Sequence, residues 1–412
     1  MKTMNHKNAD NFFWTWTTQS HASRIAVTAS HDCYFRTSGG HHVLDAISTN
    51  FQVAFGHSCA PIKDAIHMQV DAMPVANPKH EFELKTRVSN KLCSFVDAGP
   101  GRIFYTLSGA EAVENALKMA RQITGRSLVA ARAKSYHGAT MGAMSVTGDW
   151  RGQGHFGAQD ATLRIPEPAD DPDLSLTRRI IESAGSKNIA AMCLETISGM
   201  NGVIIPDASW WRGIESLCHE FKILLIIDEV SCGFGRTGKN LAMHHYGIKP
   251  DFVCMAKAIS GGYVPFGALW VKEEVAQFYD HNMLSAGLTA YAHPLGLAAA
   301  DAVLDLIKDQ AFQSAKVALT GEFTAGLLEL QRHPRVKAIR NVGLMAAIDL
   351  KSSSSDVGPK ITWERGLDYG LHFAIKENSI ILAPPFVMTS KDNQLLFHGL
   401  EKFLENFSTE AS

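Results

Sequence analysis

The chain has 412 residues, of which 46% are hydrophobic and 19% are charged, and its formal net charge is −2. This composition is typical of a globular protein with a large apolar core, and at ~150 residues per domain the length predicts roughly two to three domains, or one large domain with a smaller one. Because 39 basic residues nearly balance 41 acidic residues, the chain lacks the net field that attracts proteins to nucleic acids or anionic membranes.

Neither a membrane span nor a secretory leader is expected. The most apolar short run, residues 223–227, is far shorter than the ~20 residues of a membrane-spanning helix. Residues 1–10 carry charge, but no apolar stretch of signal-peptide length follows them. The seven cysteines are scattered singly, without a Cys-x-x-Cys pair, so we expect a reduced, cytoplasmic setting.

Short apolar, β-prone runs alternate with helix-like stretches through the middle of the chain. Runs that are apolar at nearly every position are typical of strands buried on both faces of a parallel sheet that helices cover. The sequence therefore predicts an α/β domain with a mainly parallel sheet. The strand-like runs are Ile103–Thr106, Leu128–Ala131, Ala190–Leu194, Ile223–Ile227, Phe252–Met255 and Ala268–Val271, and the helix-like stretches include Ala112–Thr124 and Trp210–Phe221.

The last part of the chain has a different pattern. It opens with Leu295–Leu306, a helix-like stretch rich in Ala and Leu, and continues with helices mixed with the strand-like runs Leu344–Leu350 and Ser379–Leu382. This mixture indicates a smaller α+β domain, to which the N-terminal segment contributes. The predicted division is a large domain over residues 49–293 and a small domain over residues 1–48 and 294–412.

Polar residues of different types follow the strand-like runs. In an open parallel sheet, ligands bind outside the carboxyl ends of the strands. Polar residues commonly end strands, but so many different functional groups at one edge indicate a site. These groups are Ser108–Glu111, Tyr136–Gly138, Glu195, Asp228–Val230 and Lys257.

The segment Ser108–Glu111 allows two interpretations. Its Ser-x-x-Glu spacing is that of a capping box at the start of a helix. Alternatively, the free amides of Gly109 and Ala110, together with the positive end of the helix dipole, bind a phosphate. The small side chains would let an anion approach the backbone.

Asp228 and Lys257 each have an ordinary and a functional interpretation. A carboxylate directly after the apolar run 223–227 either caps a loop or meets a cationic partner, because burying it alone is costly. Most lysines are solvated at the surface, whereas the small and apolar neighbours of Lys257 would lower its pKa and free it as a nucleophile. A buried carboxylate and a buried amine that both lie beside a phosphate site indicate a functional site more strongly than either group does alone.

Two other patterns are weaker. Gly233–Gly238 matches Gly-x-Gly-x-x-Gly after a strand-like run, which would suggest a nicotinamide enzyme. That fingerprint needs a helix immediately after it, and residues 239–246 leave little room for one before Gly247. The histidine pairs 41–42 and 244–245 lack further ligands at metal spacing, so we expect no metal.

Over nearly its whole length, the chain resembles the class III (ω-amino acid) aminotransferases, which are pyridoxal-phosphate-dependent (PLP-dependent) enzymes of fold type I. Each matching stretch alone is modest evidence, but all of them in this order are specific. The stretches are Ser108–Ala112 (SGAEA), Ser135–Thr140 (SYHGAT), Asp228–Gly238 (DEVSCGFGRTG), Ala256–Tyr263 (AKAISGGY) and Thr289–Pro294 (TAYAHP).

The resemblance implies a role for each of these residues, in a large domain that binds PLP. Lys257 carries the cofactor covalently and transfers protons, Asp228 pairs with the pyridine nitrogen, and Tyr136, next to His137, stacks on the ring. Ser108, Gly109 and Ala110 bind the phosphate, and Thr289 reaches the phosphate of a neighbouring subunit in an obligate dimer with shared sites. Glu195 resembles the family's gate carboxylate, although Thr196 stands where relatives often have proline.

The sequence departs from the family in two places. Ser231 stands where many relatives place a glutamine against the phenolic oxygen of the cofactor, so that contact is left to water or to another residue. Around Pro384–Pro385 the chain lacks the arginine of several relatives, so the residue that binds a substrate anion stays unassigned. The stretches 12–19 and 147–151 resemble the taurine and β-alanine branch, with Trp16 as a wall of the pocket, although aromatic residues near a terminus more often serve packing.

These features predict a cytoplasmic homodimer that transfers an amino group from an ω-amino acid, of the taurine or β-alanine type, to pyruvate or 2-oxoglutarate. Within the family, the alternatives are an aminomutase or a diamine/amine transaminase that uses the same cofactor residues. From other classes, the alternatives are an NAD-dependent oxidoreductase built on Gly233–Gly238 and a catalytically idle scaffold that only binds partners. The sequence does not identify the amino donor, because one methylene more or less in a binding pocket alters the binding free energy by only ~1–3 kcal/mol.

Overall fold

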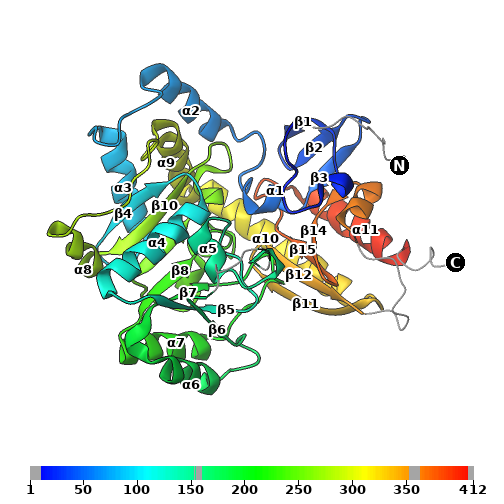
Figure 1. Cartoon of the computed structure of the whole chain (residues 1–412). Coiled ribbons are helices and arrows are strands. Elements are labelled where there is room, and N and C mark those ends of the chain that lie inside the picture. Colours follow the sequence, from blue (N-terminus) through cyan, green and yellow to red (C-terminus); the bar gives the residue numbers. More distant parts are fainter. Residues whose placement is uncertain (1–10, 153, 155–159, 352–361, 407–412) are drawn as a thin grey trace.

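A computed structural model describes residues 11–152, 154, 160–351 and 362–406. Figure 1 shows a larger part built around a broad sheet, and beside it a smaller part that carries both described ends of the chain. Residues 1–10, on which the expectation of no secretory leader depends, lie outside the described residues. Within the described ranges, no helix is both long enough and apolar enough to cross a bilayer.

The larger part contains a seven-stranded sheet in the order β4-β10-β9-β8-β7-β5-β6. All the strand-like runs predicted in the middle of the chain lie in it, and β6 is a strand that the sequence pattern did not predict. The strands are β4 (Gly101–Thr106), β5 (Leu128–Arg132), β6 (Thr162–Ile165), β7 (Ile189–Glu195), β8 (Leu224–Asp228), β9 (Phe252–Met255) and β10 (Gly267–Lys272).

One strand of this sheet runs against the others. β10 pairs antiparallel with both β4 and β9, whereas β5 to β9 pair in parallel. Only residues 256–266 join β9 to β10, and they contain a short 3₁₀ turn, η5 (Lys257–Ser260), instead of a crossover helix. A parallel return needs a longer connection, so the sheet is mainly, but not wholly, parallel.

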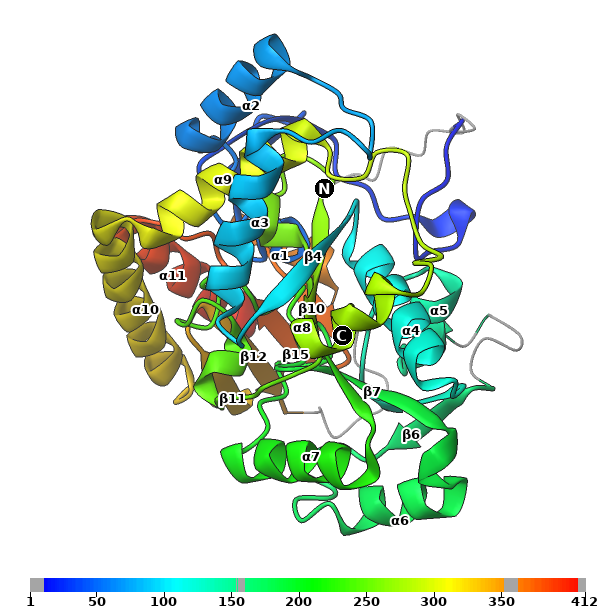
Figure 2. The ribbon, with the colours of Figure 1, turned by 90° about the vertical axis from the view of Figure 1, so that its left-hand side faces the viewer.

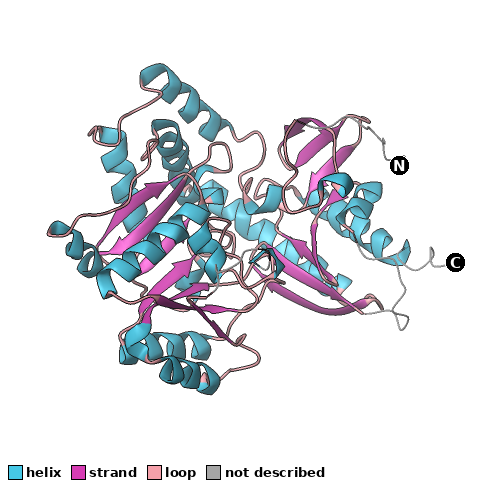
Figure 3. Ribbon diagram, viewed as in Figure 1, coloured by secondary structure: helices cyan, strands magenta, loops and turns pink. Residues whose placement is uncertain are grey.

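Helices cover both faces of the sheet (Figure 3). On β8, Ile226 belongs to the apolar cluster under α4 (Gly109–Thr124), whereas Leu225 and Ile227 belong to the larger cluster on the opposite face. This burial on both faces explains why the run is apolar at every position. The opposite face is covered by α3 (Glu83–Val96), α7 (Ala208–Phe221) and α9 (Pro294–Lys308), and Figure 2 shows α3 and α9 side by side.

The smaller part contains two four-stranded sheets. In the first, β3 pairs in parallel with β13, which joins the N-terminal segment to the C-terminal part of the chain. The boundaries near residues 49 and 293 remain a prediction, because strand pairing does not define them. The strands are β1 (Val27–His31), β2 (Tyr34–Thr37), β3 (His42–Asp45) and β13 (Leu371–His372), then β11 (Val336–Val342), β12 (Met345–Leu350), β15 (Ser379–Leu382) and β14 (Ala374–Lys376).

The long helix α10 (Gln310–Leu330) packs against α11 (Ser390–Asn406) in this part. The remaining helices are α1 (Ser48–Phe51), α2 (Ala60–Ala72), α5 (Met141–Val146), α6 (Ser175–Ala184) and α8 (Glu273–Ala276), with 3₁₀ turns η1 (Gln19–His21), η2 (Trp150–Gly152), η3 (Ser186–Asn188), η4 (Ala242–His245), η6 (Gln277–Asp280) and η7 (Trp363–Tyr369).

Candidate active site

A cavity of about 350 Å³ lies where several strands of the large sheet end. Most of the residues that the sequence singled out line it, which confirms that the segments after β4, β5, β8 and β9 meet at one edge. Its volume is in the range of small-molecule sites. The lining residues are Gln52, Leu107–Ala110, Tyr136–Gly138, Asp228, Val230, Ser231, Ala256, Lys257, Ser260, Gly262 and Val264–Phe266.

The N-terminus of α4 forms one wall of the cavity. The Ser108 hydroxyl caps the helix by accepting a hydrogen bond from the Glu111 amide at 3.2 Å, and the Glu111 carboxylate accepts one from the Leu107 amide at 2.7 Å. The amides of Gly109 and Ala110 have no acceptor within the helix. The capping and anion-binding interpretations are therefore compatible, because the cap leaves these N–H groups free.

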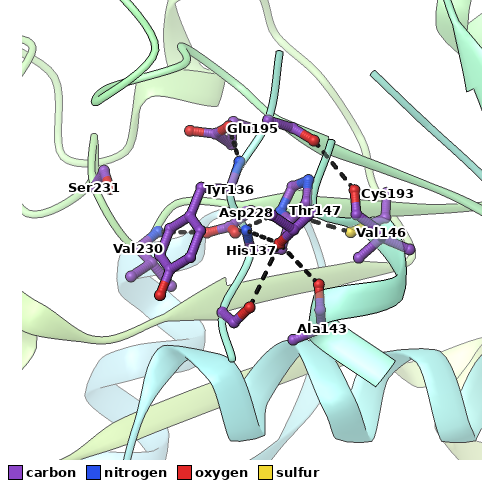
Figure 4. A network of polar contacts seen from close by, with 12 residues as sticks. Tyr136, His137, Ala143, Val146, Thr147, Cys193, Glu195, Asp228, Val230 and Ser231 are labelled. Atoms are coloured by element: carbon purple, nitrogen blue, oxygen red, sulfur yellow. Dashed lines mark hydrogen bonds and ion pairs between the residues drawn. The ribbon is translucent and has the colours of Figure 1, made fainter. Parts of the chain in front are cut away.

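Asp228 ends β8 and is almost fully buried. Its carboxylate accepts a hydrogen bond from the Val230 amide at 2.9 Å and lies 2.8 Å from Nδ1 of His137 (Figure 4). Burial disfavours a charged imidazole, but the Cys193 sulfur and the Asp228 carboxylate outweigh it, and the pKa of His137 is raised well above its usual value. His137 thus holds the Asp228 carboxylate in position through this contact.

Lys257 opens the 3₁₀ turn after β9 with a left-handed φ of 51°, a conformation that costs energy in a non-glycine residue and is enriched at active sites. Its Nζ donates a hydrogen bond to the Ser231 hydroxyl at 2.6 Å. Burial lowers the pKa of the amine, although the Asp228 and Glu195 carboxylates oppose the shift. Ser231, which the sequence left without a clear contact, therefore holds the Lys257 amine.

Phe51 is a site residue that the sequence pattern did not indicate. The Lys257 Nζ lies 5.4 Å from the centroid of its ring. Residues 48–51 all have left-handed φ values, between 45° and 69°, each costing about 1–2 kcal/mol. Apart from its asparagine, a residue type that tolerates this conformation, the local sequence does not signal this turn, because it contains no glycine. Tertiary contacts such as the hydrogen bond from the Ser48 hydroxyl to the Ala383 carbonyl at 2.6 Å hold it.

Glu195 ends β7 directly beside Asp228 in the sheet register. Its buried carboxylate accepts hydrogen bonds from the Tyr136 amide at 3.1 Å, the Ser198 hydroxyl at 3.1 Å and the Gly199 amide at 3.3 Å. Burial raises its pKa, against the opposing effect of His137 and Arg132. Glu195 does not line the cavity, and it is joined to the site by the hydrogen bond that it accepts from the Tyr136 amide.

Trp16 and Thr289 also lie outside the cavity lining. The Trp16 ring meets the Tyr136 ring edge-on, with centroids 6.0 Å apart, so Trp16 does belong to the surroundings of the site. Thr289 is exposed, and its contact with the phosphate of a neighbouring subunit stays a prediction.

The glycine-rich segment Gly233–Gly238 forms turns after β8. Between it and β9 the structure has only the 3₁₀ turn η4, so no helix N-terminus faces it as a dinucleotide pyrophosphate requires. Its Arg236 guanidinium is buried and donates to the Pro384 carbonyl and the Ser48 hydroxyl. The segment therefore connects the two parts of the molecule.

The class III aminotransferase family matches residues 16–404 of the chain. The protein belongs to this family. It is 30% identical over 396 residues to the omega-aminotransferase of Caulobacter vibrioides, covering 88% of this chain and 89% of that one. The solved structure of taurine:2-oxoglutarate aminotransferase from Bifidobacterium kashiwanohense, with PLP and glutamate, matches with a TM-score of 0.89 and 29% identity over 95% of both chains. A PLP-bound amine transaminase from an uncultivated Pseudomonas species matches with a TM-score of 0.88 and 28% identity over 97% of this chain and 99% of that chain.

Class III aminotransferases depend on PLP, which is the cofactor of this enzyme. The donors around the cavity fit it: free helix amides suit a phosphate, a buried carboxylate suits a protonated ring nitrogen, and an amine of lowered pKa suits an aldehyde. A Cβ at Gly109 would lie 2.8 Å from both Val230 methyl groups, so glycine is needed for the helix start to reach this wall.

Proposed function

We propose that this aminotransferase transfers the amino group of an ω-amino acid, of the taurine or β-alanine type, to pyruvate or 2-oxoglutarate. The proposed chemistry rests on one observation. The amine of Lys257, the carboxylate of Asp228 and the N-terminus of α4, with its free amides, line the same cavity. The similarity to an omega-aminotransferase and to a taurine:2-oxoglutarate aminotransferase supports this class of donor.

We assign cofactor binding to the residues around the cavity. The amides of Gly109 and Ala110, with Ser108, would bind the phosphate, and Tyr136 would stack on the ring. Asp228, held in position by His137, would hold the proton on the ring nitrogen through a charge-assisted hydrogen bond of about 1.5–3 kcal/mol. When bound, PLP supplies an electron sink for the carbon that carries the amino group.

We assign two tasks to Lys257, the covalent attachment of PLP and proton transfer. Its Nζ accepts the proton from the carbon that carries the donor's amino group. Because burial lowers the pKa of this amine, a larger fraction of it is neutral near pH 7 and able to act as a base. The Ser231 hydroxyl fixes the position of Nζ. Glu195 would serve the site by holding the backbone of Tyr136.

We also propose a cytoplasmic homodimer with sites shared between its subunits. Thr289 is exposed in the single chain, which leaves its hydroxyl accessible to the phosphate site of a second copy. All seven cysteines are unpaired, which supports a reducing compartment.

An amine or diamine transaminase is the second candidate, supported by the similarity to the Pseudomonas amine transaminase. A screen of purified holoenzyme separates the two. Taurine, β-alanine and a simple alkyl amine are added in turn, and the visible absorption of the bound cofactor is followed before and after addition of pyruvate or 2-oxoglutarate. We expect bleaching by the acidic donors and recovery with a keto acid. Bleaching by the alkyl amine alone would overturn the ω-amino acid assignment.

A further inference from the structure

A groove of about 460 Å³ lies between the helices α10 and α11 of the smaller part of the molecule. Figure 2 shows these two helices beside each other. All residues that line the groove belong to the two helices, and none of them lines the cofactor cavity. The reaction proposed above therefore gives this groove no role.

Three carboxylates line the groove, those of Glu322, Glu329 and Glu401. Within the part of the chain that the structure describes, none of the three forms an ion pair, and neither lysine nor arginine lines the groove. His398 is the basic residue in the lining. The excess of negative charge in a concave surface attracts cations.

Asn393 supplies a hydrogen-bond acceptor that the fold leaves without a donor. Its side chain lines the groove and is only 6% exposed, and its Oδ1 atom has no partner among the described residues. A buried amide oxygen without a hydrogen bond is costly, so this atom indicates a donor from outside the chain. Carboxylate and amide oxygens together suit a ligand with positively charged N–H groups.

The floor of the groove between these polar groups is apolar. The Phe397 ring lies against Gly326, where a Cβ would be 2.3 Å from ring atoms, and its centroid is 5.8 Å from that of the Phe323 ring. Glycine at position 326 thus lets the ring approach the backbone of α10. Leu330 also lines the groove and is 5% exposed. A hydrocarbon chain on this floor would bury apolar surface.

The carboxylates are spaced along the groove. Glu329 follows Glu322 by seven residues, or ~10 Å along α10. The Ser390 hydroxyl donates to the Glu322 carboxylate at 2.7 Å, and Glu401 follows Ser390 by eleven residues, or ~16 Å along α11. Accordingly, no three histidine, cysteine, aspartate or glutamate side chains in the described ranges are placed to hold a metal ion. The spacing fits a long ligand with a charge at each end better than a metal ion.

We propose that the groove between α10 and α11 binds a linear aliphatic diammonium, the chemistry of diamines and polyamines. One ammonium group contacts Glu322 and donates to the Asn393 amide oxygen, which lies one turn from Ser390 on α11. The other ammonium group contacts Glu329 and Glu401. The methylene chain between them lies on the Phe397 ring.

The test uses a probe that cannot react with PLP. N,N,N′,N′-tetramethyl-1,6-hexanediamine has two tertiary ammonium groups, each with one N–H, and a tertiary amine forms no imine with an aldehyde. It is titrated into holoenzyme by calorimetry while the visible absorption of the cofactor is followed, so the result does not depend on the proposed function. We expect saturable binding without a change in absorption. Absence of saturable binding, or a change in the cofactor absorption on binding, would overturn the inference.

A matched amine tests the need for two charges. N,N-dimethylhexylamine has the same six-carbon chain but only one ammonium group, and we expect it to bind at least ~10-fold more weakly than the diamine. Equal binding of the two amines would show that the groove recognises only a hydrocarbon chain and would refute the diammonium assignment.

A double variant tests the carboxylates. Glu329→Gln/Glu401→Gln removes two charges from the groove, and Asp170→Asn/Glu182→Gln removes two exposed charges elsewhere. We expect the first to weaken binding of the diamine by roughly 5- to 10-fold and the control by less than ~2-fold. Equal losses in both variants would mean that the probe responds only to the net charge of the protein, which would refute the site.

Asn393→Leu tests the unpartnered acceptor. Because the amide oxygen has no donor within the described chain, a leucine of similar size should leave the unfolding temperature of the holoenzyme without probe unchanged or higher. The diamine should raise the unfolding temperature of the wild type, and should raise that of Asn393→Leu much less. A variant that unfolds at a lower temperature without probe, but gains as much from the diamine as the wild type does, would show that Asn393 is only structural and would overturn the inference.

Discussion

The carboxylate of Asp228 lies 2.8 Å from Nδ1 of His137, and both side chains are almost completely excluded from solvent. A buried carboxylate needs such a partner, since removing one member of a buried ion pair leaves an uncompensated charge. The pair links two strand ends, because His137 follows β5 and Asp228 ends β8.

His137→Gln should therefore destabilise the protein by about 3 kcal/mol. Because the pKa of His137 is raised in the folded state, its stabilising effect is complete below the unfolded value of ~6.5 and is lost as pH rises through the higher folded value. Urea unfolding of wild type and variant from pH 6 to pH 10 measures the difference. It should shrink toward alkaline pH, and a difference that grows would contradict the assignment. The exposed His219→Gln serves as control.

Lys257→Ala should abolish covalent attachment of PLP and all transamination, while the exposed Lys118→Ala should leave both unchanged. Hydride reduction of the holoenzyme, digestion and mass spectrometry locate the modified lysine. Loss of a covalent catalyst commonly costs several orders of magnitude in rate. An unmodified Lys257 peptide in the wild type would disprove the central role of this residue.

Ser108→Ala should cost about 1 kcal/mol of stability, because it removes the N-cap of α4. Asp309→Ala removes the equivalent cap of α10, where the Asp309 carboxylate accepts from the Phe312 amide at 2.8 Å, and should cost a similar amount. Thermal unfolding of the apoenzymes measures both losses. Only Ser108→Ala should also weaken PLP binding, and equal PLP affinity in the two variants would count against a phosphate site at this helix.

Ser231→Ala should lower the pKa of Lys257 further, because the hydroxyl accepts a hydrogen bond from Nζ and so stabilises the charged amine. The pH dependence of labelling of Lys257 by an amine-reactive reagent, measured on apoenzyme, should move to lower pH by roughly one unit. Ser314→Ala, at an exposed helix position, controls for general effects. A shift to higher pH would mean that Ser231 donates to a neutral amine instead.

Much of the architecture and of the candidate site could be predicted from the sequence, because the signals involved are local. A strand buried on both faces needs apolar residues at consecutive positions, as in β8. A ligand site at strand ends needs polar residues directly after such runs, as at Asp228 and Lys257. These requirements, together with the ordered motifs of the family, predicted the α/β fold, the edge that carries the site and the dependence on PLP.

Other features arise only in the tertiary structure, because they depend on contacts between segments that are distant in sequence. β10 runs antiparallel to β9 because the connection between the two strands is short. The left-handed turn that brings Phe51 to Lys257 is held by contacts with residues that are distant in the sequence. The Ser231 contact with Lys257 needs the completed packing of several strand ends. Hydropathy patterns specify which residues are buried, whereas side-chain partners depend on how the elements pack.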